Sequence, residues 1–259
     1  VVSGSGTFSS ATAFTATVSG LSYGANTFRW TVSNGSCMPS TSDVTITLSE
    51  PPTTASAGAN QQLCELNTTA TATLAGNNPS VGTGTWTVVS GSGTLRNPKQ
   101  FNATVNGISY GDNIFRWTIT NGSCPPTTSD VTITLSEPPT VANAGTNQEL
   151  CGLNTTTTAT LAGNTPAVGN GTWTVVSGTG TFSNANAFNA TVTGLSYGTN
   201  IFRWTVANGS CMASTDEVTI TLYEPPTTAN AGSNQQVCGV NTTTSVNLSA
   251  NDPTVGTGM

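Results

Sequence analysis

The stretch FRWTVSNGSC, residues 28–37, returns as FRWTITNGSC at 115–124 and as FRWTVANGSC at 202–211. In each copy Phe and Trp alternate with Arg and Thr, which is the period of a β-strand with one apolar face. The Asn-Gly-Ser that follows is a turn signal. The stretch therefore predicts a strand that enters a hairpin, and its inward side chains predict core positions at Phe28, Trp30, Phe115, Trp117, Phe202 and Trp204.

The copies are 87 residues apart, and the whole chain follows this interval. PPTTASAGANQQLCELN at 51 returns as PPTVANAGTNQELCGLN at 138 and as PPTTANAGSNQQVCGVN at 225. Residues 51–137 and 138–224 align without a gap, with about 70% identity. We expect two complete repeats, each one domain, at 51–137 and 138–224, the C-terminal part of a repeat at 1–50 and the N-terminal part of one at 225–259. We expect these three periods to be a window from a longer array.

Alternation of apolar and polar residues recurs through the repeat, separated by Gly, Asn and Ser, while no stretch shows the apolar stripe of a helix. The sequence therefore predicts an all-β fold, a seven-stranded sandwich for each repeat. In the repeat 138–224 we expect strands near 141–150, 157–162, 171–177, 179–183, 187–193, 200–207 and 216–223.

The composition excludes several classes of function. Only 6% of residues are charged, the net charge is −6 and the chain has no His, which argues against nucleic-acid binding and against a catalytic triad. The cysteines lack a C-x-x-C spacing and no phosphate loop is present, so we expect no metal, no cofactor and no enzyme activity. No apolar run reaches the roughly 18 residues of a membrane helix, so we expect no membrane insertion in this window.

Three segments of the repeat carry a family resemblance: ANAGTNQELC at its start, GTWTVVSGTGTF in its middle, and TVTGLSYGTNIFRWTVANGSC with DEVTITL at its end. They resemble the PKD-like, immunoglobulin-like tandem repeats of giant secreted proteins of Bacteroidota. That resemblance implies seven-stranded sandwiches arranged as beads, in adhesins, gliding-associated proteins or fibres exported by the type IX route. The acidic D-x-D pattern of some such repeats is missing here. Leu195, Tyr197 and Gly198 look like the tyrosine corner of immunoglobulin domains.

The linkers between repeats read SEPPT at 49 and 136 and YEPPT at 223. Paired prolines fix φ and favour an extended path, so we expect short, stiff joints and a rod. The sequence thus favours a structural repeat region of a secreted or cell-surface adhesin stalk or filament, with neighbouring repeats or other copies as partners. The alternative is a weak binding module for a surface glycan or ice on Thr-rich sheet faces.

Arg29, Arg116 and Arg203 recur on the outward face of the hairpin strand. One interpretation is a cross-strand pair with an acidic residue, for which Asp43, Asp130 and Glu217 recur, as do the glutamates before the prolines, Glu50, Glu137 and Glu224. The other interpretation is contact with a partner.

Each repeat period holds two cysteines, and we expect disulfides in a secreted chain. Pairing within a repeat would join Cys64 with Cys124 and Cys151 with Cys211. Immunoglobulin topology, however, puts the loops that hold these cysteines at opposite ends of a sandwich, which favours a bond between Cys64 and Cys211 of successive repeats. Free thiols and bonds between chains are further alternatives. The candidate residues are Cys37, Cys64, Cys124, Cys151, Cys211 and Cys238.

Overall fold

The computed structural model of the protein describes residues 1–67, 69–239 and 245–259. Every regular element in these ranges is a β-strand. The chain divides into two compact units, Val1–Glu137 and Pro138–Met259, and each is described by itself below. No helix that could span a bilayer occurs among the described residues.

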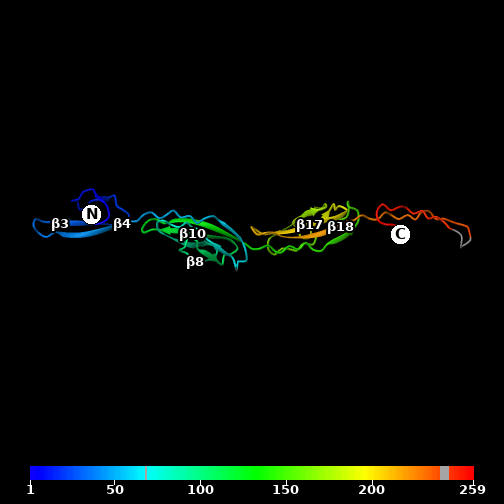
Figure 1. Ribbon diagram of the computed structural model, residues 1–259, viewed down its shortest axis with the longest axis horizontal. Coiled ribbons are helices and arrows are strands. Elements are labelled where there is room, and N and C mark those ends of the chain that lie inside the picture. Colours follow the sequence, from blue (N-terminus) through cyan, green and yellow to red (C-terminus); the bar gives the residue numbers. More distant parts are fainter. Residues whose placement is uncertain (68, 240–244) are drawn as a thin grey trace. The chain divides into compact units, whose positions relative to one another are not determined.

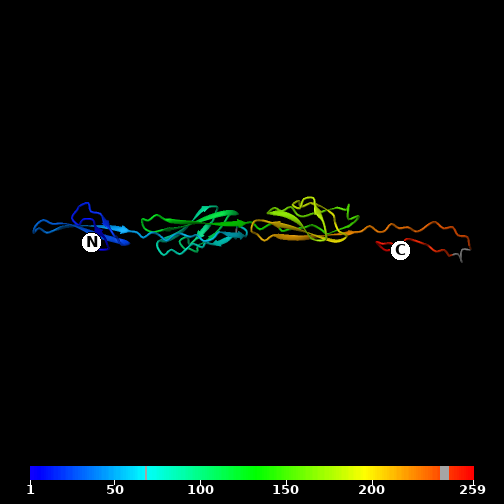
Figure 2. The ribbon, with the colours of Figure 1, turned by 90° about the horizontal axis from the view of Figure 1, so that it is seen from above.

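The first unit contains a complete sandwich in residues 51–137. Its larger sheet has the order β5-β11-β10-β7 and its smaller sheet the order β6-β9-β8. Figure 1 shows β10 and β8 in different layers, and Figure 2 shows the same repeat after a turn of 90°. β5 runs parallel to β11, and every other pairing is antiparallel. The strands are β5 Gln61–Cys64, β6 Thr71–Thr73, β7 Thr83–Ser90, β8 Thr94–Arg96, β9 Thr104–Asn106, β10 Gly111–Thr120 and β11 Thr127–Ser136.

The second unit repeats this arrangement in residues 138–224. Its sheets have the orders β12-β18-β17-β14 and β13-β16-β15. Seven strands in two sheets, with this pairing, confirm the immunoglobulin-like sandwich that the alternation predicted. The strands are β12 Gln148–Cys151, β13 Ala159–Thr160, β14 Asn170–Ser177, β15 Thr181–Phe182, β16 Thr191–Thr193, β17 Gly198–Ala207 and β18 Ser214–Tyr223.

The first predicted strand, 141–150, is shorter in the structure, because its initial residues bond to side chains rather than to a backbone ladder. Ala142 N donates to Ser214 Oγ over 2.9 Å and Ala144 N donates to Asp216 Oδ2 over 2.7 Å. Only Gln148–Cys151 pairs with β18 through the backbone. The strands predicted at 157–162 and 179–183 are likewise reduced to two residues near their centres, and the strand predicted at 187–193 to its last three residues.

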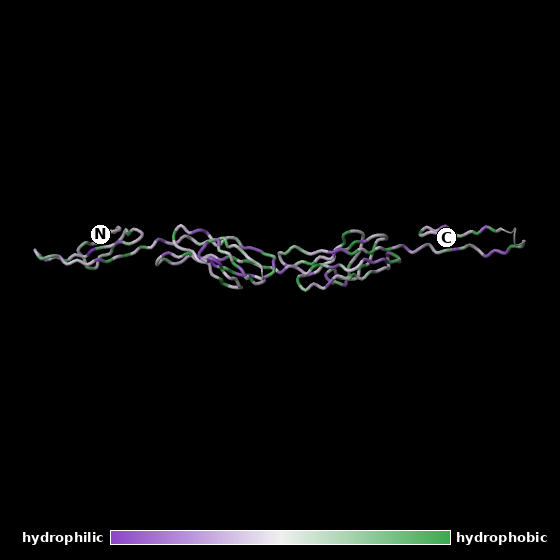
Figure 3. Tube along the Cα trace, turned by 60° about the horizontal axis from the view of Figure 1, so that its bottom comes forward, coloured by the Kyte–Doolittle hydropathy of each residue, from purple (hydrophilic) through white to green (hydrophobic). Residues whose placement is uncertain are grey.

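The core of each complete repeat lies between its two sheets. Figure 3 shows hydrophobic and hydrophilic residues following one another along the chain, and the apolar side of each strand is buried as alternation requires. Two Trp rings lie at the centre of each core, with centroids 5.0 Å apart for Trp86 and Trp117 and 4.9 Å apart for Trp173 and Trp204. Phe115 and Phe202 are also fully buried. Five of the six predicted core residues are therefore correct.

The sixth prediction, Trp30, is wrong, because its side chain is 45% exposed whereas Trp117 is fully buried. Residues 1–50 form two small sheets, β1-β2 and β3-β4. In the complete repeat, Gly76 and Gly84 lie against the ring of Trp117. Phe28 stays buried because Phe8 packs edge-on against it at 5.3 Å. The strands are β1 Thr7–Phe8, β2 Val18–Ser19, β3 Gly24–Val32 and β4 Ser40–Leu48.

Residues 225–259 hold no strand in their described part, yet they keep contacts that the complete repeats make. Thr227 N donates to Val255 O over 3.1 Å, as Thr53 N does to Val81 O in the first unit. This hydrogen bond therefore forms within residues 225–259 alone.

Candidate functional site

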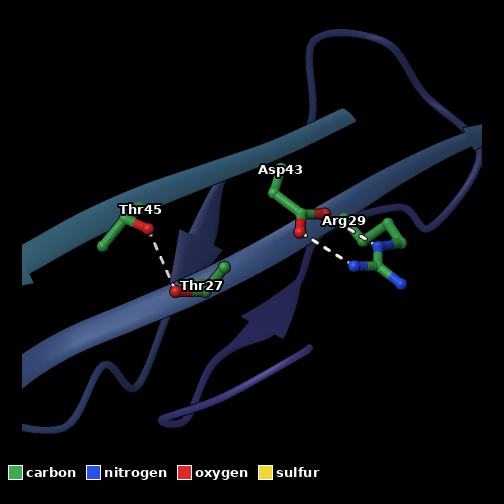
Figure 4. Close-up of polar contacts among 4 residues, drawn as sticks. All are labelled: Thr27, Arg29, Asp43 and Thr45. Carbon is green, nitrogen blue, oxygen red and sulfur yellow. Dashed lines mark hydrogen bonds and ion pairs between the residues drawn. The ribbon is translucent and has the colours of Figure 1, made fainter. Parts of the chain in front are cut away.

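The recurring Arg of the hairpin strand lies on the outer face and pairs with the acidic residue directly opposite on the next strand. Arg29 and Asp43 are register partners, and Figure 4 shows their side chains meeting in a two-pronged contact. Nε and Nη2 of Arg29 donate to the two carboxylate oxygens over 2.8 and 2.9 Å. This planar fork is the geometry for which guanidinium is suited.

The same pair recurs in both complete repeats. Arg116 donates to Asp130 over 2.7 and 2.8 Å, and Arg203 donates twice to Oε1 of Glu217, over 2.9 and 2.6 Å. The hydrogen bonds from Arg116 hold the pKa of the Asp130 carboxyl below its ordinary value, and Arg29 acts likewise on Asp43. The predicted cross-strand pairing is confirmed with Asp43, Asp130 and Glu217, while a role of the three arginines in partner contacts stays a prediction.

Threonine side chains surround these ion pairs. Thr27 and Thr45 share a hydrogen bond of 3.0 Å beside the first pair (Figure 4). In the first unit a row of threonines crosses three strands, because β10 pairs in register with both β7 and β11. The row recurs one period later in the second unit. Its members are Thr85, Thr118 and Thr128, and then Thr172, Thr205 and Thr215.

A buried asparagine is the polar residue that the sequence interpretation missed. Asn113 is fully buried and uses both ends of its amide. Oδ1 accepts from the backbone N–H of Ser92 and from the hydroxyl of Ser109, over 2.9 and 2.8 Å. Nδ2 donates to the carbonyls of Ser109 and Gly111, over 2.8 and 3.1 Å. The signal was the recurrence of Asn26, Asn113 and Asn200 at an inward strand position, where alternation calls for an apolar residue.

The tyrosine of the predicted corner contacts a distant part of the chain. The backbone N–H of Asn154 donates to Tyr197 Oη over 3.4 Å, and that of Asn67 donates to Tyr110 Oη over 3.3 Å. The hydroxyl oxygen of Tyr197 thus accepts a hydrogen bond from a residue 43 positions earlier in the chain, while its ring is partly exposed. It ties the loop after the first strand to the start of the sixth.

A groove of about 420 Å³ lies over the inner face of residues 1–50. Its apolar lining includes Phe14, Phe28, Trp30 and Ile46. The residues one period after Phe28, Trp30 and Ile46 are Phe115, Trp117 and Ile133, which are fully buried in a sandwich core. The groove thus matches a core face of the complete repeat, and its lining is mostly apolar, with Ser10 and Arg29 as its polar residues.

The two cysteines of a repeat lie at opposite ends of the larger sheet. Cys64 ends β5 beside Ser136, whereas Cys124 lies in the β10–β11 hairpin before Thr127. The ten residues of β11 separate these ends by roughly 30 Å, while a disulfide needs Cα atoms within about 7 Å. Cys124 and Cys151 are free thiols, as are Cys37 and Cys238, and Cys64 and Cys211 are each disulfide-bonded. The pairing within a repeat is therefore wrong.

Among the described residues, no group of His, Cys, Asp and Glu side chains is arranged to hold a metal ion. The recurring carboxylates Asp43, Asp130 and Glu217 are each paired with an arginine. The outer faces of the hairpin strands therefore present threonine hydroxyl groups and paired charges.

No protein-family model matches the chain, and no curated protein is significantly similar to it in sequence. Among solved structures, the chain is similar to the PKD domain from KIAA 1837 protein, with 24% identity over 32% of this chain and 85% of that one and a TM-score of 0.28. It is also similar to extracellular domains 3–5 of Drosophila OTK, with 10% identity over 76% and 71% of the two chains and a TM-score of 0.45. It is similar as well to immunoglobulin domains 1–4 of Sidekick-1, with 12% identity over 67% of this chain and 49% of that one and a TM-score of 0.45.

Proposed function

We propose that this chain is a non-catalytic structural region of an extracellular adhesin stalk or filament, to which each immunoglobulin-like repeat adds length and stiffness. The observation that carries the proposal is the position of the two linkers of a repeat. The chain enters the repeat 51–137 at one end of the larger sheet and leaves it at the other end.

The entry is fixed by three contacts with the β10–β11 hairpin. Asn121 Nδ2 donates to Glu50 O over 2.8 Å, Ser123 N donates to Ser49 Oγ over 3.3 Å, and Cys124 Sγ donates to Ser49 O over 3.3 Å. Ser49 and Glu50 are the last residues before the paired prolines. The segment that enters the repeat is thus held against the hairpin rather than loosely tethered.

The exit lies at the far end of β11, which runs from Thr127 beside the hairpin to Ser136. Each repeat therefore carries the chain forward by about one strand length, roughly 30 Å for ten residues. Pro138 and Pro139 then restrict the backbone of the next linker. A unit that takes in the chain at one end and releases it at the other favours an extended array of beads over a folded-back one.

The near-identity of the two complete repeats supports a spacer. Their core positions correspond one by one at the repeat interval, from Trp86 and Trp173 to Leu135 and Leu222. A specific binding domain needs one distinct site, whereas a stalk needs only length. The bonded cysteines Cys64 and Cys211 fit an oxidising, extracellular location.

Small-angle scattering tests the proposal by comparing the chain with a variant from which residues 138–224 are deleted. The deletion removes one whole period and leaves an intact EPP linker. Both proteins are measured with a reductant, so that disulfides do not contribute. We expect the maximum dimension to fall by roughly 35–40 Å, a strand length with its loops. An unchanged maximum dimension, or compact globular particles in electron micrographs, would overturn the stalk.

A second candidate function rests on the threonine rows of the outer sheet faces. Thr85, Thr118 and Thr128 lie side by side in register, and the row recurs at Thr172, Thr205 and Thr215. A weak site for a surface glycan or ice, multiplied by repetition, would gain avidity. Glycan-array binding or ice shaping by the chain, lost on changing Thr118 and Thr205 to Val, would favour this function over the spacer.

A further inference from the structure

We propose that Cys64 and Cys211 are bonded to each other, so that the end of the first strand in one repeat is covalently joined to the hairpin of the next repeat. This bond, the inter-repeat staple, goes beyond the proposed function and does not depend on it.

The first step is the position of Cys64. It is the last residue of β5 and the register partner of Ser136, the last residue of β11. Ser136 stands directly before Glu137 and the prolines of the next linker. Cys64 therefore lies at the exit end of its repeat, where the chain passes on.

The second step is the position of the hairpin cysteine. In the first unit Cys124 Sγ lies 3.3 Å from Ser49 O and 3.5 Å from Glu50 O. Ser49 and Glu50 belong to the linker that comes from the preceding repeat segment. The hairpin cysteine of a repeat therefore lies against the last residues of the repeat before it.

The third step applies the repeat interval of 87 residues. It carries Cys124 to Cys211 and Ser49 to Ser136. If the second joint follows the contacts of the first, Cys211 lies against Ser136, which is the residue that Cys64 already flanks. Both sulfur atoms are then placed beside one residue, within the short distance that a disulfide requires.

The oxidation states of the six cysteines agree with this rule. The rule is that the first-strand cysteine of one repeat bonds to the hairpin cysteine of the next repeat. Within residues 1–259 only Cys64 and Cys211 satisfy it. These two are disulfide-bonded, and the other four are free. Under the rule the partners of Cys37, Cys124, Cys151 and Cys238 would carry numbers outside this range.

The chemistry is thiol–disulfide exchange. The two thiols lose two protons and two electrons as their S–S bond forms, and a disulfide-bearing oxidant protein takes up both and becomes a dithiol.

Tryptic peptide mapping without reductant tests the staple, because Arg and Lys are few. Cleavage separates the cysteines into three peptides: residues 30–96 with Cys37 and Cys64, residues 117–203 with Cys124 and Cys151, and residues 204–259 with Cys211 and Cys238. From the monomer band of a non-reducing gel we expect one linked species, 30–96 joined to 204–259, which disappears on reduction.

Matched variants assign the sulfur atoms. Cys64→Ser and Cys211→Ser should each abolish the linked species, whereas Cys37→Ser and Cys238→Ser should leave it intact. A link that involves peptide 117–203, a link found only in dimers, three unlinked peptides, or a link that survives Cys64→Ser would each overturn the staple. None of these outcomes changes the scattering experiment on the reduced chain, so failure of the staple and failure of the stalk are distinguishable.

Discussion

Asn113 Oδ1 accepts a hydrogen bond of 2.9 Å from the backbone N–H of Ser92, so a fully buried amide joins β10 to the loop between β7 and β8. The pairing of β10 with β7 shifts register next to this point, between Ile114 and Phe115. The Asn113 side chain bonds backbone groups of Ser92, Ser109, Gly111 and Ile133. A buried polar group that is left unsatisfied costs about 1–3 kcal/mol.

Asn113→Asp should therefore destabilise the repeat 51–137 by about 3 kcal/mol at neutral pH. The new oxygen would face the carbonyls of Ser109 and Gly111 in place of the donor Nδ2. Burial raises the pKa of such a carboxyl above its unfolded value, so the destabilisation should grow as pH rises from about 4. Hydrogen exchange measures the effect through faster exchange in β10, with β17 of the unchanged repeat as an internal reference.

Asn78→Asp is the matched control for this change, because Asn78 is exposed. This substitution should have little effect on hydrogen exchange in β10. Equal exchange rates in the two Asp variants would contradict the role of Asn113 as a buried connector.

Gly84→Ala should destabilise the same repeat by about 1–3 kcal/mol through overpacking. A Cβ at Gly84 would meet Cζ2 and Cη2 of Trp117, a fully buried ring. Those two carbons are absent from phenylalanine. The cost of Gly84→Ala should therefore be smaller in a Trp117→Phe background, and denaturant unfolding of the four proteins gives the coupling free energy. If the free-energy costs of Gly84→Ala and Trp117→Phe are additive, the Trp117 ring is not what disfavours a larger side chain at position 84.

These two positions show how far the sequence could predict the fold. Alternation and turn signals were sufficient for the seven strands and for Trp117, because period two identifies the apolar face. They could not predict Asn113, whose amide bonds Ser109 nearby and also Ser92 and Ile133 in two distant segments. They also could not predict that residues 141–147 bond to side chains such as Ser214 and Asp216, since periodicity does not identify acceptors.

The candidate sites were predictable to the extent that they depend on register. Arg116 and Asp130 recur in the copies of the repeat and face each other because a hairpin pairs them. The predicted disulfide within a repeat is wrong because the register of β5 with β11 puts Cys64 beside Ser136, far from the hairpin cysteine. Sequence alone left both cysteine pairings open, because it does not show the register in which the first strand pairs with its neighbour in the sheet.

The Arg116–Asp130 ion pair predicts a pH dependence on the acid side. The folded-state pKa of Asp130 is lowered, chiefly by the hydrogen bonds from Arg116, so its contribution to stability is present above the unfolded pKa of about 3.9 and is lost as pH falls through the folded value. NMR titration should show the pKa of Asp130 rising to its ordinary range in Arg116→Gln. Arg96→Gln in the same repeat is the control, and a shift of equal size there would indicate a general charge effect instead.

Trp30 should account for nearly all of the fluorescence that acrylamide can quench. The chain has five tryptophans, and Trp30 is 45% exposed whereas Trp86, Trp117, Trp173 and Trp204 are at most 1% exposed. Trp117 lies against Gly76 and Gly84 in its own sandwich, whereas Trp30 lines an open groove. Trp30→Phe should therefore remove the quenchable emission and leave a blue-shifted remainder.

Trp117→Phe is the matched control, because it removes a buried ring and should leave the quenchable fraction in place. The measurement is made over a range of protein concentrations. If quenching of Trp30 is weak even in dilute solution, its face is covered and the assignment of an open core face is wrong. If quenching weakens only as concentration rises, the face is open in the single chain and becomes covered by other copies, since exposed apolar surface of this kind drives association.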